Sequence, residues 1–210
     1  MPSPRPPSEY RLWIQRVIWG FTWFLVHFLR TDVCGTVPDA PCIIVSNHFH
    51  NIDAPLAGRF AIRFGERVHW LAKVELFHIP VLGAVLRAMQ TVPVDRDNPD
   101  RQSLQHIISY ARLDKVWIFP EGHRSGDGHL QPAKEGVALI ARYARVPLVP
   151  IGIVGTQDGP LPLLLHRKTL RIRIGEPFTI SATLRRAEVL ELIEAKIEEL
   201  LPAEHRRVHP

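Results

Sequence analysis

Short apolar runs alternate along the chain with longer amphipathic stretches, and this alternation predicts an α/β fold. The short runs are rich in Ile and Val, which is typical of strands, whereas an apolar stripe along a longer stretch is typical of a helix. The expected strands are residues 42–46, 68–72, 91–94, 116–119, 148–154 and 169–174. The expected helices are residues 9–29, 54–64, 80–89, 101–112, 134–143 and 184–200. Strands separated by helices favour a single domain with a largely parallel central sheet flanked by helices.

The N-terminal stretch is distinguished by its aromatic residues. Residues 1–8 are rich in proline and are expected to be disordered. The following helix has an apolar core of about a dozen residues, shorter than the roughly 20 that a membrane-spanning helix needs. Its rings suit the water–lipid boundary: Trp13, Trp19, Phe21, Trp23, Phe24 and Phe28. We therefore divide the chain into residues 1–30, a disordered tip with a membrane-interface helix, and residues 31–210, the main domain; packing of the helix on the domain's own core is the alternative.

Composition and charge narrow the classes of partner. The chain has 210 residues, of which 46% are hydrophobic and 22% charged, as in a globular protein. Its net charge of +5 favours an anionic partner, such as nucleic acid, a phosphorylated metabolite or a bilayer surface. Nucleic acid is disfavoured because the aromatic residues are not interleaved with the basic ones, as a stacking platform requires. Two cysteines, Cys34 and Cys42, are too few for a disulfide framework and fit a reducing compartment.

The first candidate for chemistry follows the apolar run at residues 42–46. It contains His48 and, five positions later, Asp53. Within one helix these two side chains would diverge by about 140°. They converge only where His48 lies on the preceding turn and Asp53 begins the helix, and Pro55 agrees with this because proline is tolerated in a first helical turn. A carboxylate on one imidazole nitrogen makes the other a general base for a hydroxyl proton.

Two other interpretations of this segment remain open from the sequence. His50, together with His48 and Asp53, offers three ligands of types that bind zinc. No further His or Cys cluster supports such a site, so we expect no metal. The other interpretation is structural, with a hydrogen-bonded core histidine and with Asp53 acting as a helix cap.

A second polar segment follows the apolar run at residues 116–119. Here Gly122 permits unusual backbone angles, and Arg124 offers a forked cation suited to a phosphate or a carboxylate. Glu121 is expected to hold this loop or to orient the arginine. A turn with a surface ion pair is the ordinary alternative for such a loop.

Two further cations, Lys73 and Arg96, follow other expected strands. Ligands of α/β sheets bind beyond the carboxyl ends of the strands, so these cations are expected to meet His48 and Arg124 there. A basic pocket beside a general base indicates a phosphorylated acceptor with a free hydroxyl. A different segment, residues 159–165, is apolar, contains proline and is bordered by basic residues, so it either contacts a membrane or folds back over the sheet.

Taken together, these segments resemble the glycerolipid acyltransferases of the lysophosphatidate acyltransferase group. The family's first block, Asn-His-x4-Asp, is similar to Asn47-His48 and Asp53, and its third block, Phe-Pro-Glu-Gly-Thr-Arg-Ser, is similar to residues 119–125. The second and fourth blocks resemble residues 83–96 and 146–151. The blocks follow the family's order, and His123 stands where the family usually has threonine.

The resemblance implies that residues 31–210 form an acyltransferase domain. His48, oriented by Asp53, would deprotonate the hydroxyl of lysophosphatidate, which attacks the thioester of acyl-CoA or acyl-carrier protein to form phosphatidate. The residues expected to bind the acceptor or shape its loop are Asn47, Lys73, Arg96, Glu121, Gly122 and Arg124. An oxyanion stabiliser is required in principle, and Asn47 or a backbone amide near Gly122 are the candidates.

The same resemblance sets the expected partners and location. The partners are a lysophospholipid, an acyl thioester donor and a membrane surface, with no cofactor beyond the co-substrate and no nucleic acid. The protein is expected at the cytoplasmic face of the membrane, in a peripheral or monotopic arrangement. The alternatives are another lysolipid acceptor, such as a lyso-aminolipid, or a non-catalytic lipid-binding protein of the same fold.

Overall fold

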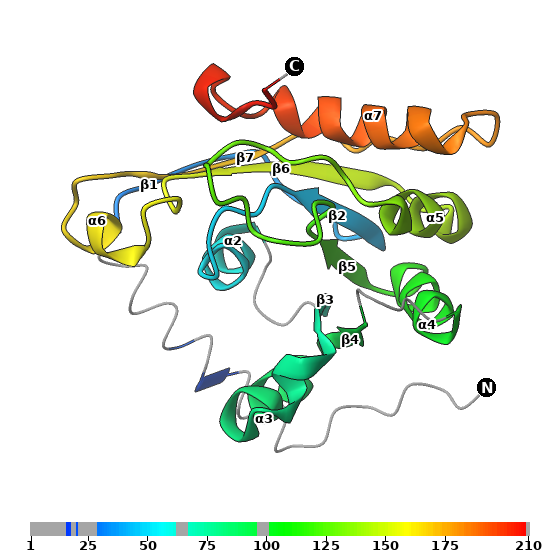
Figure 1. Cartoon of the computed structure of the whole chain (residues 1–210), viewed down its shortest axis with the longest axis horizontal. Helices are drawn as coiled ribbons and strands as arrows, with labels where there is room; N and C mark the ends of the chain where they lie inside the picture. The colour runs from blue at the N-terminus through cyan, green and yellow to red at the C-terminus, as the bar shows by residue number, and fades with distance from the viewer. Residues whose placement is uncertain (1–15, 18–19, 21–28, 62–66, 96–100, 209–210) are drawn as a thin grey trace.

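The computed structural model describes residues 16–17, 20, 29–61, 67–95 and 101–208, and these form one α/β domain (Figure 1). Its strands are β1 (Thr31–Cys34), β2 (Cys42–Ser46), β3 (Val68–Lys73), β4 (Val92–Val94), β5 (Lys115–Ile118), β6 (Leu148–Val154) and β7 (Leu170–Ile174). Its α-helices include α2 (Asp53–Ala61), α3 (Pro80–Ala88), α4 (Arg101–Ala111), α5 (Glu135–Ala144), α6 (Pro160–Leu164) and α7 (Arg186–Glu198). Two short 3-10 helices are η1 (Val74–His78) and η2 (Ala203–His205).

The strands form a 7-stranded sheet in the order β1-β7-β6-β2-β5-β3-β4. The central strand β2 pairs in parallel with β5 and β6, and β3 pairs in parallel with β5 and β4. Only β1 and β7 run the other way: β7 is antiparallel to β6 and parallel to β1. The carboxyl ends of β2 to β6 therefore meet at one side of the sheet, which we call the carboxyl edge.

Helices cover both faces of this sheet, with α7 and α2 on opposite sides of it (Figure 1). Ile43 and Val45 of β2 point into the core formed with α4, α5 and α7, whereas Cys42 and Ile44 point into the core covered by α2. All four side chains are fully buried. Because both faces of β2 are covered, its sequence is continuously apolar instead of alternating.

The predicted fold class is confirmed. Each expected strand is present within one residue of its predicted ends. The sequence analysis did not predict β1, η1, α6 or η2, and α6 lies within the apolar segment at residues 159–165. The expected N-terminal helix at residues 9–29 falls almost wholly outside the described residues. Within the described part of the chain, no helix is both long and apolar enough to cross a bilayer.

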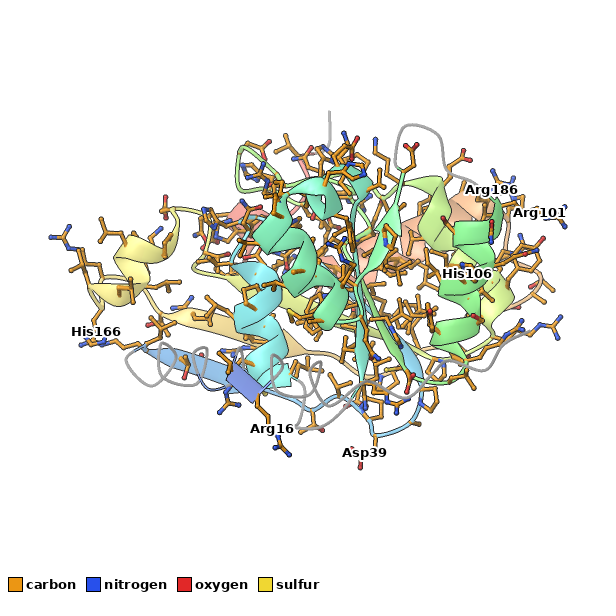
Figure 2. All side chains as sticks on the ribbon, turned by 90° about the horizontal axis from the view of Figure 1, so that it is seen from below. Arg16, Asp39, Arg101, His106, His166 and Arg186 are labelled. Carbon is orange, nitrogen blue, oxygen red and sulfur yellow. The ribbon has the colours of Figure 1, made fainter. Side chains whose placement is uncertain are left out.

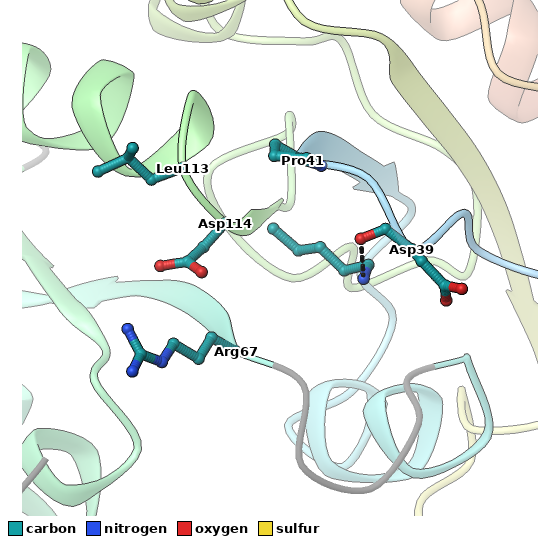
Figure 3. A pocket seen from close by; sticks show the side chains of 6 residues that line it. Asp39, Pro41, Arg67, Leu113 and Asp114 are labelled. Carbon is teal, nitrogen blue, oxygen red and sulfur yellow. Dashed lines mark hydrogen bonds between the residues drawn. The ribbon is translucent and has the colours of Figure 1, made fainter. Parts of the chain in front are cut away.

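The opposite side of the sheet, where the strands begin, contains a small polar cavity (Figure 3). Its volume is about 190 Å³. It is lined by Asp39, Pro41, Arg67, Leu113, Asp114 and Lys115. The Lys115 ammonium donates a hydrogen bond of 3.3 Å to the backbone carbonyl of Asp39 and so ties the start of β5 to the chain before β2.

Candidate active site

His48 and Asp53 form a hydrogen-bonded pair in the loop that joins β2 to α2. The distance between His48 Nδ1 and Asp53 Oδ2 is 3.0 Å. The same oxygen accepts the backbone N–H groups of Phe49 and His50, each at 2.7 Å. Asp53 is fully buried and is the first residue of α2, as the sequence predicted. One carboxylate oxygen thus closes the turn and orients the imidazole.

The tautomer of the neutral His48 ring follows from these contacts. A carboxylate only accepts hydrogen bonds, so in the neutral ring Nδ1 carries the proton and Nε2 has the lone pair. The ring stacks on Phe119, with 4.0 Å between the centroids and 19° between the planes. Its side chain is 14% exposed, so solvent or a substrate reaches it. The ring is thus held by packing on one side and by a carboxylate on the other, which leaves Nε2 as the nitrogen able to accept a proton.

Asn47 is buried beneath this loop, at the end of β2. Its side-chain amide donates to the carbonyl of Ile153 and its side-chain oxygen accepts the N–H of Ile153, both at 2.7 Å. Asn47 is fully buried, so in this structure its amide joins β2 to β6. Its predicted contact with substrate, or with an oxyanion, remains a prediction.

Glu121 joins the His48 loop to the loop that follows β5. Its Oε1 accepts the N–H of His48 at 2.7 Å, and its Oε2 accepts the N–H of Gln131 at 3.0 Å. The side chain is fully buried. Burial raises the pKa of Glu121 to about 8, although the two backbone N–H groups act in the opposite direction. The predicted loop-holding role of Glu121 agrees with these contacts.

The loop after β5 places its polar residues beside His48. Ser125 donates its N–H to the His48 carbonyl at 2.8 Å, so Arg124 adjoins the histidine loop while its own side chain is exposed. Gly122 has a φ of +73°, a conformation that favours glycine, and a Cβ there would lie 3.2 Å from Lys134 Cγ. The Gly122 N–H donates to the carbonyl of Phe119 at 3.1 Å, so this candidate oxyanion donor already has a partner.

Of the two remaining predicted cations, Lys73 and Arg96, the structure describes only Lys73. Lys73 is the last residue of β3 and therefore lies at the carboxyl edge, where its ammonium is 3.1 Å from the Glu75 carboxylate. Arg96 falls outside the described residues. The structure thus brings together His48, Asp53, Glu121 and the loop of Arg124, and it places Lys73 at the same edge of the sheet.

A metal site finds no support among the described side chains. They contain no group of three or more His, Cys, Asp and Glu residues arranged to hold a metal ion. In particular, Asp53 Oδ2 is occupied by three donors, and His50 Nδ1 accepts the N–H of Ile52 at 3.3 Å.

The matched stretch of the chain now identifies its family. A family model described as Acyltransferase matches residues 30–154, which is more than half of the chain and contains the loops just described. The chain belongs to the acyltransferase family. The family resemblance stated from the sequence motifs is therefore confirmed.

Individual relatives agree with this membership. The chain is 36% identical to a chloroplastic 1-acyl-sn-glycerol-3-phosphate acyltransferase of Brassica napus, over 61% of this chain and 38% of that protein. It is 29% identical to a 1-acyl-sn-glycerol-3-phosphate acyltransferase of Bacillus subtilis, over 77% of this chain and 82% of that protein. Thus the chain spans less than half of the plant relative and most of the bacterial one.

A solved structure is similar over nearly the whole fold. It is that of the 1-acyl-sn-glycerophosphate acyltransferase PlsC from Thermotoga maritima, with a TM-score of 0.68 and 26% sequence identity. The similarity covers 94% of this chain and 83% of that one. It therefore includes residues beyond the stretch matched by the family model.

Sequence reasoning missed several residues that build the site. Phe119 was taken only as part of a motif, yet it is the ring on which His48 packs. Gln131 was not considered, because it acts through its backbone N–H and its side chain carries no signal. Ser125 likewise contributes a backbone N–H. Such contacts depend on the path of a loop and not on residue type.

Proposed function

We propose that this protein transfers a fatty acyl group from a thioester donor to the free hydroxyl of lysophosphatidate and so forms phosphatidate. The observation that carries the proposal is the His48–Asp53 pair, 3.0 Å apart, beside the loop of Arg124. The names of the relatives support lysophosphatidate as the acceptor. The donor is acyl-CoA or acyl-carrier protein, and both react through the same thioester.

In the proposed mechanism His48 acts first as a base and then as an acid. Its Nε2 takes the hydroxyl proton of the acceptor while that oxygen attacks the thioester carbonyl carbon. Asp53 stabilises the imidazolium formed at this step. The tetrahedral intermediate then collapses, the carbon–sulfur bond breaks, and the thiolate takes the proton from Nε2. The products are an ester and a free thiol, so the protein itself forms no covalent intermediate.

The acceptor phosphate is assigned to the exposed cations at the carboxyl edge. Arg124 presents a planar fork of donors, which matches a phosphate better than a point charge does. Lys73 lies at the end of a strand two positions from β2 in the sheet and adds positive charge at the same edge. Arg96 is proposed for the same role from its place in the sequence motif.

The acyl transfer is tested with the purified protein and labelled donors. Labelled acyl-CoA and labelled acyl-carrier protein are each incubated with lysophosphatidate and with a lyso-aminolipid. We expect labelled phosphatidate, and we expect no product from His48→Ala. Transfer only to the lyso-aminolipid would change the acceptor, whereas no transfer to any acceptor from either donor would favour a non-catalytic lipid-binding protein.

We also propose that the protein contacts the membrane peripherally, at its cytoplasmic face. Three leucines of α6 and its end are exposed, Leu161 by 62%, Leu164 by 46% and Leu165 by 53%. Arg167 and Arg171, both exposed, follow them in the chain. We call these five residues the α6 patch. Apolar side chains beside basic ones suit an anionic lipid surface, which is characteristic of the cytoplasmic leaflet.

The position of the α6 patch agrees with lipid substrates. Helix α6 follows β6, and η1 with α3 follows β3, so the two segments flank β2 and β5 at the carboxyl edge. The second segment also exposes large apolar side chains, including Ile79 by 49% and Val81 by 79%. At the start of α6, a Cβ on Gly159 would lie 3.7 Å from the His50 ring, which places this helix beside the histidine loop. Lipid held by these segments would lie near His48.

A further inference from the structure

The last described residues, 202–208, pack against the loops of the candidate active site; we call them the C-terminal strap. The strap follows α7 and includes η2. Its backbone accepts two hydrogen bonds from the loop after β5: Leu130 N–H donates to the His205 carbonyl at 3.0 Å, and His129 Nδ1 donates to the Arg206 carbonyl at 3.1 Å. The strap lies outside the residues that the family model matches, so the family motifs assign it no role.

The side chain of His205 contacts three loops at once. Its Nδ1 donates to the carbonyl of Gly128 at 2.8 Å, in the loop after β5. Since a carbonyl only accepts, Nε2 holds the lone pair in the neutral ring, and it faces the side-chain amide of Gln157 at 3.4 Å, in the loop after β6. The ring also packs on Phe49 in the loop after β2, with 5.4 Å between the centroids.

Two of these contacts connect His205 to residues of the proposed mechanism, namely Asp53 through Phe49 and Arg124 through the loop of Gly128. Phe49 gives its N–H to the Asp53 carboxylate, which orients His48. Gly128 ends the short stretch that begins at Gly122 and carries Arg124. A shift of the His205 ring therefore changes the support of both the base and the phosphate-binding loop.

Ion pairs hold the strap to α7. Arg207 donates to the Glu198 carboxylate at 2.8 Å through Nε and is also paired with Glu194. Glu194 is 6% exposed, and its other oxygen accepts the N–H of Ala133 at 2.6 Å. Two residues earlier, Gln131 is held by Glu121, which also binds the N–H of His48. The strap, α7 and the His48 loop are thus connected by hydrogen bonds and ion pairs.

We propose that His205 is a positioning residue for acyl transfer, which holds the loops after β2, β5 and β6 together around His48 and Arg124. This inference rests on the proposed function. The hydrogen bond to Gly128 supports acceptor binding, and the ring contact with Phe49 supports the orientation of His48.

Two substitutions separate these contacts. His205→Phe keeps a ring beside Phe49 and loses the donor to Gly128, so we expect an increase of about tenfold in the KM for lysophosphatidate with kcat little changed. His205→Asn keeps a donor for Gly128 and loses the ring, so we expect kcat to fall about tenfold with KM little changed. Wild-type kcat and KM in both variants would overturn the proposal.

Matched controls distinguish positioning from general stability. His106→Ala removes an exposed histidine of α4, a helix that lies well away from the red C-terminal segment in Figure 1, and is expected to leave the kinetics unchanged. Val189→Ala truncates a fully buried side chain of α7, so it lowers thermal stability without touching the loops. If the His205 variants lose no more activity per folded molecule than Val189→Ala, the strap is ordinary packing and the inference is wrong.

A second measurement does not depend on catalysis. In the full chain, His205→Ala is expected to raise amide hydrogen exchange in residues 46–53 and 122–131, whereas His106→Ala leaves both segments unchanged. Unchanged exchange in both segments of His205→Ala would contradict the positioning role. If the wild-type protein transfers no acyl group but His205→Ala still raises exchange in these segments, the proposed function is wrong and His205 nevertheless holds the loops.

Discussion

At the scale of single residues, two acidic side chains, Asp53 and Glu121, accept the hydrogen bonds that hold the His48 loop. Asp53 Oδ2 takes two backbone N–H groups and the imidazole Nδ1. Glu121 takes the N–H of His48 itself. Both acidic side chains and the N–H of Phe49 are buried, and an unpaired buried donor destabilises a fold by about 1–3 kcal/mol. The same two acidic side chains therefore serve the fold and, in the proposed mechanism, the base.

The charge of Asp53 is tested by Asp53→Asn. An amide oxygen in the place of Oδ2 still accepts the three donors, so the loop is expected to keep its conformation. The neutral amide no longer stabilises an imidazolium, and we expect kcat to fall by about 10²- to 10⁴-fold while the protein stays folded. Circular dichroism and acyl transfer measured on one preparation check both parts. A folded variant with wild-type turnover would remove Asp53 from the mechanism.

Glu121 gives a prediction about stability and pH. Its pKa is about 8 in the folded protein against 4.5 for an ordinary glutamate, so folding favours the protonated form. The resulting stabilisation is complete below pH 4.5 and is lost as the pH rises to about 8. Within that window the free energy of unfolding is expected to fall by up to about 1.4 kcal/mol per pH unit from this group.

Urea unfolding of the wild type and of Glu121→Gln across this pH range measures the effect. The variant lacks the titrating carboxyl, so its stability deficit relative to the wild type should shrink as the pH rises from 5 towards 8. Glu176→Gln, at an exposed position, is the control and should show a constant difference. A constant difference for Glu121→Gln as well would show that its pKa is not raised.

The proposed role of Arg124 in binding the acceptor phosphate is tested by the KM for lysophosphatidate. Its exposed guanidinium lies one residue from Ser125, which is bonded to the His48 loop. Arg124→Ala removes the fork of donors, so the KM for lysophosphatidate should rise by at least about tenfold, with a smaller change in kcat. Arg124→Lys keeps the charge but not the fork and should recover only part of the loss. Normal acceptor affinity in Arg124→Ala would place the phosphate elsewhere.

The contact between His48 and Asp53 was predictable because the two residues are close in sequence and because proline is tolerated only in the first turn of a helix. Pro55 limits where the helix can begin, and this put Asp53 at its start. The partners of Asn47 and Glu121 were not predictable in the same way, since Ile153 lies 106 positions from Asn47 and His48 lies 73 positions from Glu121. Contacts between such distant positions depend on which strands are neighbours, and no single-residue preference encodes that.

At the scale of elements, the central strands were predicted well and the edge elements were not. β2, β5 and β6 are buried runs of apolar residues, so their sequence signal is strong. β1 is exposed at all four positions and is stabilised by pairing with β7, which a local pattern does not reveal. α6 has only five residues and buries Leu163 alone, so it lacks a helical stripe.

The two hydrogen bonds of Asn47 that join β2 to β6 give a prediction about stability. Asn47→Ala leaves both the N–H and the carbonyl of Ile153 without their side-chain partner, in the middle of the sheet. We expect the free energy of unfolding to fall by about 2–4 kcal/mol, as measured by urea denaturation. Asn51→Ala removes an exposed asparagine a few residues away and should change stability little. Equal stability of the two variants would show that the Asn47 amide does not join the strands.

At the scale of the whole molecule, basic side chains lie at both ends of the described structure (Figure 2). In the view of Figure 2, His166, next to the α6 patch, lies at one end of the molecule, and Arg101, His106 and Arg186 lie at the other. Basic side chains at the two ends can therefore be removed separately, although the chain has a single net charge of +5. If membrane binding depended on total charge alone, removing an arginine would weaken it equally at any position. If it depended on the α6 patch, only arginines of that patch would matter.

Two double substitutions with the same change in net charge separate these cases. Arg167→Gln with Arg171→Gln alters the α6 patch, and Arg101→Gln with Arg186→Gln alters the opposite end (Figure 2). Each basic residue near an anionic surface contributes about 1 kcal/mol, so the first pair should weaken sedimentation with anionic vesicles by roughly tenfold or more. The second pair should bind nearly as the wild type does, and the difference should diminish in high salt because the interaction is screened. An equal loss of vesicle binding in both double variants would mean that binding depends on net charge, and the α6 patch would then not be the contact surface.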